Sequence, residues 1–323
     1  MKSLNLVECI FSKNYDFESG IICTYGLNLN FFENYIMKLD ALYSADNISI
    51  FTDSSTYNGF LHESYTPRWL NKKYLVNHLK TGGVFHAKLY MFASKKKAVV
   101  GIGSANITRD GIASNLELLS VFEVSEKKTL YASLLLDCID YVRRLATITK
   151  SQSAYEQVEL FSETCRAFLT TGLEKHIHFI HNLDRPIIED LIENASKHRV
   201  SKIQVISPFY DVELAALEAL KNAFPKSKVE IYIQQKKSNF PRMMFDKIKP
   251  NVSLYVYKNI DRYLHGKAIL FHCNDEVLLY FGSANFSKSA LVEKPPVGNF
   301  EIGLLSNIDT ENAEHIIDRK SVV

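Results

Sequence analysis

A histidine, a lysine, a serine and an asparagine recur in both halves of the sequence at matched spacing. The two sets are His86, Lys88, Ser104 and Asn106, and His265, Lys267, Ser283 and Asn285. The serine follows the histidine by 18 positions in both (86 to 104 and 265 to 283), within a Gly-Ser-Ala-Asn tetrapeptide. Residues two apart on a strand share one face. Neighbouring strands could therefore bring an imidazole, an ammonium, a hydroxyl and an amide together.

These groups suit a phosphate. Lysine supplies positive charge and asparagine supplies a neutral donor for non-bridging phosphate oxygens. A carboxylate on the second ring nitrogen of a catalytic histidine would set its tautomer and raise its basicity. Glu117 and Glu301 are the candidates, because each follows an asparagine by two positions, Asn115 and Asn299, beyond its motif. The alternative is that both glutamates point outward from half-buried strands.

One set of these residues is half of a phosphoryl-transfer site, and two facing sets would complete it. One histidine would attack phosphorus in line while the other protonates the departing oxygen. Water activated by the second histidine would then release the covalent phosphohistidine. Two lysines and two asparagines would spread the developing charge, so neither a metal ion nor a cofactor is expected. Ser104 and Ser283 are candidates for a supporting role, with bonds to nearby backbone as the alternative.

The paired motif, His-x-Lys followed by Gly-Ser-x-Asn, resembles that of the phospholipase D superfamily, and the resemblance covers both halves of the chain. It implies two similar α/β sandwich halves related by a pseudo-two-fold axis, with one active site at their junction. By motif order it also implies that His86 is the nucleophile and His265 the general acid. Gly103 and Gly282 are expected to let the backbone pass close to the phosphate.

The sequence departs from the superfamily members that act on lipids, which usually carry an aspartate five residues after the lysine. Those positions are Ala93 and His272. The departure favours the nuclease-like members, so we expect a metal-independent phosphodiesterase that cleaves nucleic acid, with DNA favoured over RNA, in a role such as bacterial defence or restriction. The alternatives are a phospholipase D or phosphatidyltransferase, an inactive scaffold, and a nuclease subunit that needs a partner ATPase or helicase, since no Walker motif is present.

Two loops combine basic and aromatic residues and are candidates for substrate binding. The first spans 55–74 and the second 234–244; their candidates are Arg68, Trp69, Lys72, Lys73, Lys236, Lys237 and Arg242. Such a combination suits a strand of nucleic acid through charge and base stacking. The alternative for the first loop is that it packs Trp69 onto the domain.

Strand-like and helical patterns alternate in the same order in both halves, which indicates an α/β fold. The expected order is strand, helix, strand, at 19–28, 30–45 and 47–53 and again at 201–211, 212–225 and 228–235. Each half should then have a strand ending at its His-x-Lys, a strand running into Gly-Ser-Ala-Asn, and a third containing Asn-x-Glu. A long helix is expected at 126–148. The most linker-like segment is 149–157, so the halves are assigned to 1–150 and 151–323, with the boundary open from 148 to 195.

Composition limits the remaining possibilities. The chain has 323 residues, of which 46% are hydrophobic and 23% charged, as in globular proteins. Five scattered cysteines without a Cys-x-x-Cys pair predict reduced thiols and a cytoplasmic protein. No apolar run approaches the ~20 residues that span a bilayer, so no membrane association is expected. A net charge of +2 neither requires nor excludes a polyanionic partner. Both half-sites lie in one chain, so a monomer suffices for chemistry, and a homo-oligomer remains an alternative.

Overall fold

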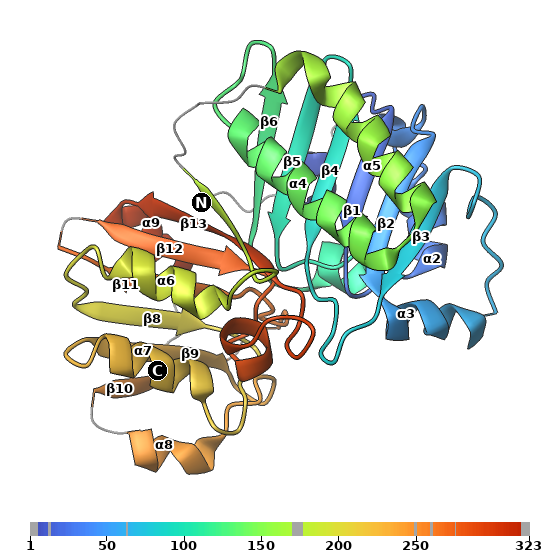
Figure 1. Cartoon of the computed structure of the whole chain (residues 1–323). Coiled ribbons are helices and arrows are strands. Elements are labelled where there is room, and N and C mark those ends of the chain that lie inside the picture. Colours follow the sequence, from blue (N-terminus) through green and yellow to red (C-terminus); the bar gives the residue numbers. More distant parts are fainter. Residues whose placement is uncertain are drawn as a thin grey trace.

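The chain folds into two mixed β-sheets flanked by helices (Figure 1). The structure is a computed structural model that describes residues 6–11, 14–62, 64–169, 177–248, 251–258, 261–274 and 276–317. The first sheet has the order β3 (Tyr74–Leu79), β2 (Asn47–Asp53), β1 (Ser19–Cys23), β4 (Leu89–Ser94), β5 (Lys97–Gly103), β6 (Leu119–Ser125). In this sheet β1, β2 and β3 are parallel, and the other pairings are antiparallel.

The second sheet repeats this order with one added edge strand. It runs β10 (Val252–Tyr257), β9 (Lys228–Gln234), β8 (Lys202–Ile206), β11 (Ala268–His272), β12 (Val277–Gly282), β13 (Ile302–Ile308), β7 (His178–His181). Again the first three strands are parallel and the rest antiparallel. The expected fold class, two similar α/β halves, is confirmed.

Helices cover the sheets. They are α1 (Leu6–Ile10), α2 (Leu29–Phe31), α3 (Ser54–Gly59), α4 (Ala132–Thr149), α5 (Gln152–Cys165), α6 (Ile187–Ala195), α7 (Ala215–Ala223), α8 (Arg242–Ile248) and α9 (Thr310–Ile317). The two longest, α4 and α5, lie across one face of the first sheet, while α6 and α7 lie on the second (Figure 1).

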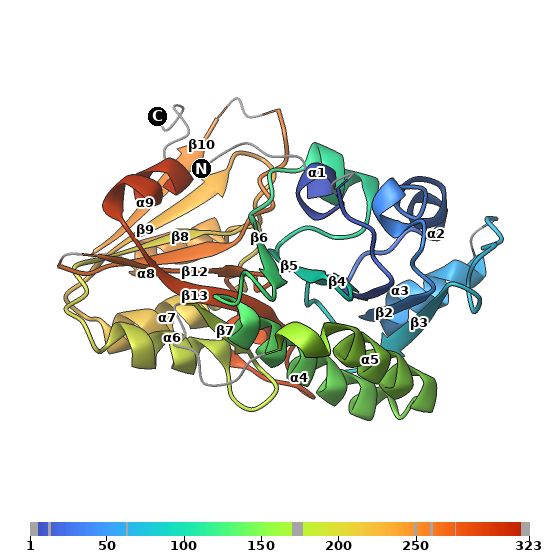
Figure 2. The same cartoon turned by 90° about the horizontal axis from the view of Figure 1, so that it is seen from above.

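A shared core joins the two halves. One cluster of buried apolar side chains contains Cys23 and Val100 of the first sheet, Leu135 of α4, and Leu270 and Ile302 of the second sheet. Strand β5 contacts β12 and β13, and the two sheets meet in the middle of the molecule (Figure 2). Burying this apolar surface between the halves holds their relative position, on which any site at the junction depends.

The segment predicted to be the linker is helical instead. The Ser151 hydroxyl accepts a hydrogen bond from the Ala154 amide at 3.2 Å and caps the start of α5. Lys150 adopts a left-handed conformation, with a φ of 56°, which ends α4 and turns the chain back. Helix α5 packs on β1, β2 and β4, and its last residue, Cys165, lies within the range of 148 to 195 that was left open for the boundary. The segment forms a helix because its apolar residues line one face of α5. The polar residues between them gave it the composition of a linker.

A buried carboxylate organises the long loop of the first half. Glu33 is 3% exposed and accepts hydrogen bonds from the Tyr65 hydroxyl at 2.7 Å, the Tyr74 hydroxyl at 2.7 Å, the Arg68 amide at 2.8 Å and the Trp69 amide at 2.9 Å. Burial acts to raise the pKa of Glu33, but these four bonds outweigh it and hold the pKa below its usual value. The carboxylate therefore fastens this loop to the first half.

Removing this carboxylate should destabilise the fold. We expect Glu33→Ala to lower the free energy of unfolding by about 3 kcal/mol, because four donors lose their acceptor. Urea denaturation measures the change, with Glu126→Ala at an exposed position as the control. Because the pKa of Glu33 is lowered in the folded chain, the stabilisation is present at neutral pH and declines as acid protonates the carboxylate. An unchanged unfolding free energy would contradict this role.

Candidate active site

Each His-x-Lys segment crosses to the opposite half of the molecule. Phe85 forms a parallel bridge with Phe300, and Leu264 forms the equivalent bridge with Leu116. A motif histidine follows each bridge. The His86 amide donates to the Phe300 carbonyl and the His265 amide donates to the Leu116 carbonyl, both at 2.9 Å. The two crossing segments thus place both histidines at the junction of the halves.

The prediction that a strand ends at each His-x-Lys is wrong. Strand β4 begins at Leu89, directly after Lys88, and β11 begins at Ala268, directly after Lys267. Before each strand, the His86 and His265 amides donate to carbonyls of the other half. Local patterning identifies strands within a sheet, and it carries no signal for this pairing between halves.

Each histidine is bound by the glutamate of the other half. The Nδ1 atom of His86 lies 3.0 and 3.1 Å from the two carboxylate oxygens of Glu301. The Nδ1 atom of His265 lies 2.8 and 2.9 Å from those of Glu117. An Nδ1–H donated to a carboxylate places the lone pair of each ring on Nε2. Neither histidine is more than 9% exposed.

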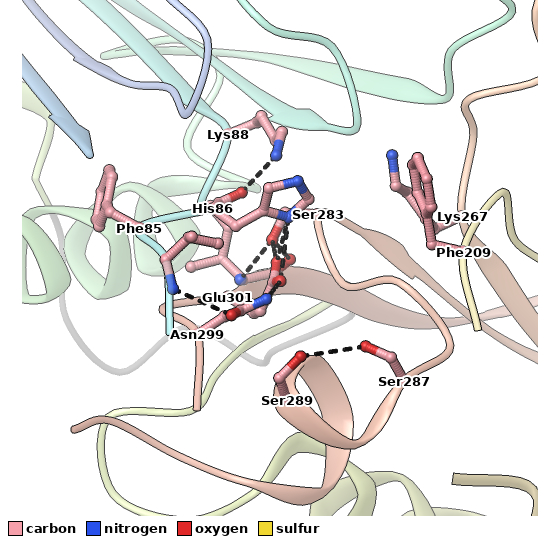
Figure 3. Close-up of polar contacts among 12 residues, drawn as sticks. Phe85, His86, Lys88, Phe209, Lys267, Ser283, Ser287, Ser289, Asn299 and Glu301 are labelled. Carbon is pink, nitrogen blue, oxygen red and sulfur yellow. Dashed lines mark hydrogen bonds and ion pairs between the residues drawn. The ribbon is translucent and has the colours of Figure 1, made fainter. Parts of the chain in front are cut away.

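Glu301 is held in place by its own half (Figure 3). The Ser283 hydroxyl donates to its carboxylate and accepts the Ile302 amide at 3.0 Å. The Asn299 side-chain amide donates to Glu301 Oε1 at 3.0 Å. With the contact to His86, these bonds leave Glu301 little freedom, and the residue is fully buried. The glutamate points inward, against the alternative that it faces outward from its strand.

Glu117 has the same surroundings in the first half. The Ser104 hydroxyl donates to Glu117 Oε2 and accepts the Leu118 amide at 3.0 Å. The Asn115 side-chain amide donates to Glu117 Oε1 at 3.1 Å. Both serines therefore hold a glutamate and contact backbone at the same time, so the two roles considered for them coexist.

The motif glycines permit this contact between serine and glutamate. A Cβ atom on Gly103 would lie 2.1 Å from the Leu118 carbonyl oxygen, and one on Gly282 would lie 2.3 Å from that of Ile302. The close approach is to the strand that follows each glutamate. The structure therefore shows these glycines making room for a backbone carbonyl, where phosphate was expected.

The two lysines approach the same space from opposite sides (Figure 3). The Lys88 ammonium donates to the His86 carbonyl at 2.6 Å. The Lys267 ammonium donates to the His265 carbonyl at 2.7 Å and lies 3.0 Å from His265 Nε2. Both lysines are at most 1% exposed. Positive charge held in this way can bind a phosphate oxygen with little reorganisation.

The two asparagines differ. Asn106 Oδ1 accepts the Gly26 amide at 3.1 Å, which turns the NH₂ group of the side chain away from that backbone. Asn285 Oδ1 is buried and has no hydrogen-bond partner within the described part of the chain. The first half therefore presents a fixed amide donor, while the equivalent side chain in the second half is not clamped by backbone.

Burial controls the charges of the histidines. It lowers the pKa of His86 to about 4, against the opposing effect of Glu301, and Lys88 and Lys267 lower it further. Burial also lowers the pKa of His265, with Lys267 as the next cause. Because each histidine is influenced by the lysines of both halves, the two half-sites form one electrostatic unit. Both rings are neutral at neutral pH.

The glutamates and Lys267 carry charge at neutral pH. Burial raises the pKa of Glu117 and of Glu301, but hydrogen bonds and charge interactions with the histidines, lysines and serines outweigh it and lower both values. Burial lowers the pKa of Lys267 to about 8 and holds that of Lys88 well below its ordinary value. The carboxylates are therefore ionised at neutral pH, and Lys267 keeps its charge below about pH 8.

The first-half candidates for substrate binding lie far from the histidines. Strand β2 reaches the site at Asp53, whose carboxylate accepts the Phe85 amide at 2.7 Å. The loop returns to the other end of β2, where the Ile48 amide donates to the Lys73 carbonyl at 3.3 Å. At ~3.3 Å per residue, five residues of strand separate the two ends by about 16 Å. The structure therefore does not bring Arg68, Trp69, Lys72 and Lys73 to the catalytic groups, because Glu33 fastens their loop elsewhere.

The second-half candidates lie closer. Strand β9 ends at Gln234, whose side-chain oxygen accepts the Leu264 amide beside His265 at 2.8 Å. Lys236 and Lys237 follow in the next turn, and Arg242 begins α8. This end of β9 corresponds to the Asp53 end of β2, so Lys236 and Lys237 lie at the end of their sheet opposite to that of Lys73.

Two aromatic residues at the site were not among the candidates. The Tyr25 ring lies 5.5 Å from the His86 ring, and the Lys88 ammonium lies 5.9 Å from the centre of the Tyr25 ring. Phe209 follows β8, whose last residue, Ile206, pairs with Ala268 next to Lys267, and both side chains lie in the same part of Figure 3. Tyr25 and Phe209 both follow the carboxyl end of a parallel strand, β1 or β8, where ligands bind in open α/β sheets. The strand-like pattern before each of these residues was the sequence signal that could have identified them.

Solved structures share this architecture. Yeast tyrosyl-DNA phosphodiesterase aligns over 90% of this chain and 82% of its own, with a TM-score of 0.60 and 13% identity. Polyphosphate kinase from Porphyromonas gingivalis aligns over 94% of this chain and 42% of its own, with a TM-score of 0.51 and 13% identity. Nuc from Salmonella typhimurium, a phospholipase D family member, aligns over 44% of this chain and 88% of its own, with a TM-score of 0.33 and 19% identity.

These comparisons support the fold alone, which consists of two similar α/β halves. No protein-family model and no curated protein sequence matches the chain. This chain spans less than half of the polyphosphate kinase. Identities of 13% leave the activity to be argued from the site itself.

The charges of the site can be measured without an enzyme assay. We expect side-chain NMR to show one lysine ammonium that titrates near pH 8, because burial of Lys267 lowers its pKa, and this signal should be absent in Lys267→Arg. The His86 ring should remain neutral from pH 5 to pH 8, with its proton on Nδ1. A Lys267 signal that titrates above pH 10, or a His86 ring that becomes charged near pH 6.5, would contradict the geometry of a buried site.

Proposed function

We propose that the protein is a metal-independent phosphodiesterase that cleaves nucleic acid, with DNA favoured, through a covalent phosphohistidine. One observation carries the proposal. Two buried histidines, each bound at Nδ1 by the glutamate of the opposite half, meet two buried lysines at one junction. This set supplies a nucleophile, an acid and two positive charges for a phosphodiester.

The first chemical step forms the intermediate. The Nε2 atom of His86 attacks phosphorus in line, and a P–N bond forms as the P–O bond to the departing nucleoside breaks. The electron pair of that bond goes to the departing oxygen, which takes a proton from Nε2 of His265. Glu301 and Glu117 act as positioning residues, because each holds the ring of one histidine and stabilises its positive charge.

The second step releases the product. Neutral His265 accepts a proton from water as the water oxygen bonds to phosphorus. The P–N bond breaks, and its electron pair returns to Nε2 of His86. Overall, one water molecule is added across the phosphodiester and both histidines regain their starting protonation. The lysines bind the non-bridging oxygens in both steps.

The general acid must gain its proton when the substrate binds. In the free protein, burial and Lys267 lower the pKa of His265, so its ring starts neutral. A phosphodiester brings a negative charge between the two lysines. That charge favours the protonated form of His265, so binding and proton uptake are coupled.

Three features favour nucleic acid over other diesters. Ala93 and His272 stand where lipid-acting members carry the motif aspartate. Lys236 and Lys237 lie in the turn that leaves the site. The yeast structure with a similar fold is a tyrosyl-DNA phosphodiesterase, so this fold accommodates a DNA phosphodiester. None of the helices in the described ranges is long and apolar enough to cross a membrane.

The setting of the activity is also part of the proposal. All five cysteines are free thiols, three of them buried, which suits a reducing compartment such as the cytoplasm. One chain contains both half-sites, so a monomer suffices for chemistry. A role in genome defence and a partner ATPase or helicase remain predictions of the family resemblance.

The activity should be independent of metal ions. We expect single- or double-stranded DNA to be cleaved in the presence of EDTA, because the lysines neutralise the charge that a metal would otherwise bear. His86→Ala and His265→Ala should each reduce the rate by at least about 10³-fold. Glu126→Ala, which changes an exposed residue, is the control. Cleavage that requires Mg²⁺, or activity only on phospholipid vesicles, would overturn the proposal.

The two glutamates should affect different steps. With the p-nitrophenyl ester of thymidine 5′-phosphate as substrate, the leaving group needs no proton. We expect Glu117→Gln to release about one equivalent of p-nitrophenol rapidly and then turn over about 10²- to 10⁴-fold slower than wild type, because His265 no longer activates water well. Glu301→Gln should show no rapid release, because His86 attacks slowly. The opposite pattern would exchange the roles of the histidines.

A further inference from the structure

The two half-sites differ in the loops that follow their first parallel strands. After β1 the chain reads Thr24, Tyr25, Gly26, and after β8 it reads Ser207, Pro208, Phe209. Both loops have the same local hydrogen bond, in which the Thr24 or Ser207 hydroxyl donates to the carbonyl two residues later, at 2.8 and 2.9 Å. Phe209 therefore occupies the position of Gly26, so a large aromatic ring in one half corresponds to a bare backbone in the other.

The backbone places Phe209 at the catalytic groups of the second half. Ile206 pairs with Ala268, the residue after Lys267, so the chain leaves β8 directly beside the lysine. The Ser207 hydroxyl accepts the Phe286 amide at 3.0 Å, one residue after the motif asparagine. Figure 3 shows Phe209 and Lys267 on the same side of the gap, opposite His86 and Lys88.

The Phe209 ring is exposed, and the aromatic ring of the first half is only partly so. Phe209 is 40% exposed, which is unusual for a phenylalanine next to buried catalytic groups. On the other side, the aromatic ring is that of Tyr25, which packs against His86 and Lys88. Gly26 uses its amide to hold Asn106. On one side of the site the aromatic ring contacts catalytic groups, and on the other side the aromatic ring is more exposed.

Positive charge adjoins this face. The turn that carries Lys236 and Lys237 is joined to the Phe209 loop, because Asn239 accepts the Tyr210 amide at 2.7 Å and donates its own amide to the Pro208 carbonyl at 3.1 Å. An aromatic face beside two lysines is the combination that binds a nucleotide, through base stacking and a phosphate contact.

We propose that Phe209 stacks on an unpaired base of the nucleoside that leaves, and that the protein therefore cleaves single-stranded or locally unpaired nucleic acid. This inference rests on the proposed function, with His86 as the nucleophile. In-line attack from His86 sends the leaving group toward His265 and Lys267, the side on which Phe209 lies. A base paired within a duplex does not offer its face to the ring, so pairing opposes this contact. Stacking uses the face that every base has, and so it gives no sequence preference.

An oligonucleotide with one missing base tests the contact. The substrate is an end-labelled, single-stranded thymidine oligonucleotide with one abasic residue in the middle, and the cleavage products are mapped on a sequencing gel. We expect the wild type to cleave the linkage whose leaving nucleoside is abasic about tenfold or more slowly than the other linkages. Phe209→Ala should cleave all linkages at an even, lower rate, and Phe209→Trp should restore the wild-type pattern.

The other linkages of the same molecule serve as an internal control for folding and chemistry. Tyr155→Ala, which removes a ring that is 42% exposed on α5, should keep the wild-type pattern. If Phe209→Ala still cleaves the linkage at the abasic residue more slowly than the others, or if the wild type cleaves all linkages equally, the role of Phe209 is overturned. The phosphodiesterase proposal then remains intact. No cleavage of any linkage by the wild type would overturn both.

Discussion

The exchange of carboxylates between the halves is the constraint on which the site depends. Glu301 binds His86 and Glu117 binds His265, so neither half contains a complete histidine–carboxylate pair. The paired residues are 215 and 148 positions apart in the chain. The apolar core shared by the two sheets, and the crossing segments that pair with the opposite half, hold these contacts in register. Stability of the interface between the halves and competence of the site are therefore linked.

Much of this arrangement could be predicted from residue types and spacing. The repeat of His-x-Lys and Gly-Ser-Ala-Asn identified residues that the fold brings together, because each copy resembles half of one phosphoryl-transfer site. The alternating strand and helix patterns were sufficient for the fold class. These signals are local or periodic, and they survive without knowledge of tertiary contacts.

Tertiary contacts explain what the sequence could not reveal. The assignment of each glutamate to the opposite histidine, and the pairing of residues 84–86 with the other half, are contacts between halves. The loop with Arg68 and Trp69 looked like a nucleic-acid surface, but the bonds to Glu33 hold it at the far end of β2. The place of Phe209 near the site could not be predicted, because it depends on the pairing of β8 with the strand that follows Lys267.

The fold is nearly symmetric, but the two half-sites differ. Equivalent backbone positions carry Gly26 and Phe209, and the two motif asparagines have different partners. The most direct test is to trap the covalent intermediate with a labelled oligonucleotide, without an acid quench, and to locate it by mass spectrometry of the digested protein. The account predicts a nucleotide attached to His86, accumulated in Glu117→Gln. A nucleotide attached to His265, or rapid cleavage without any adduct, would contradict it.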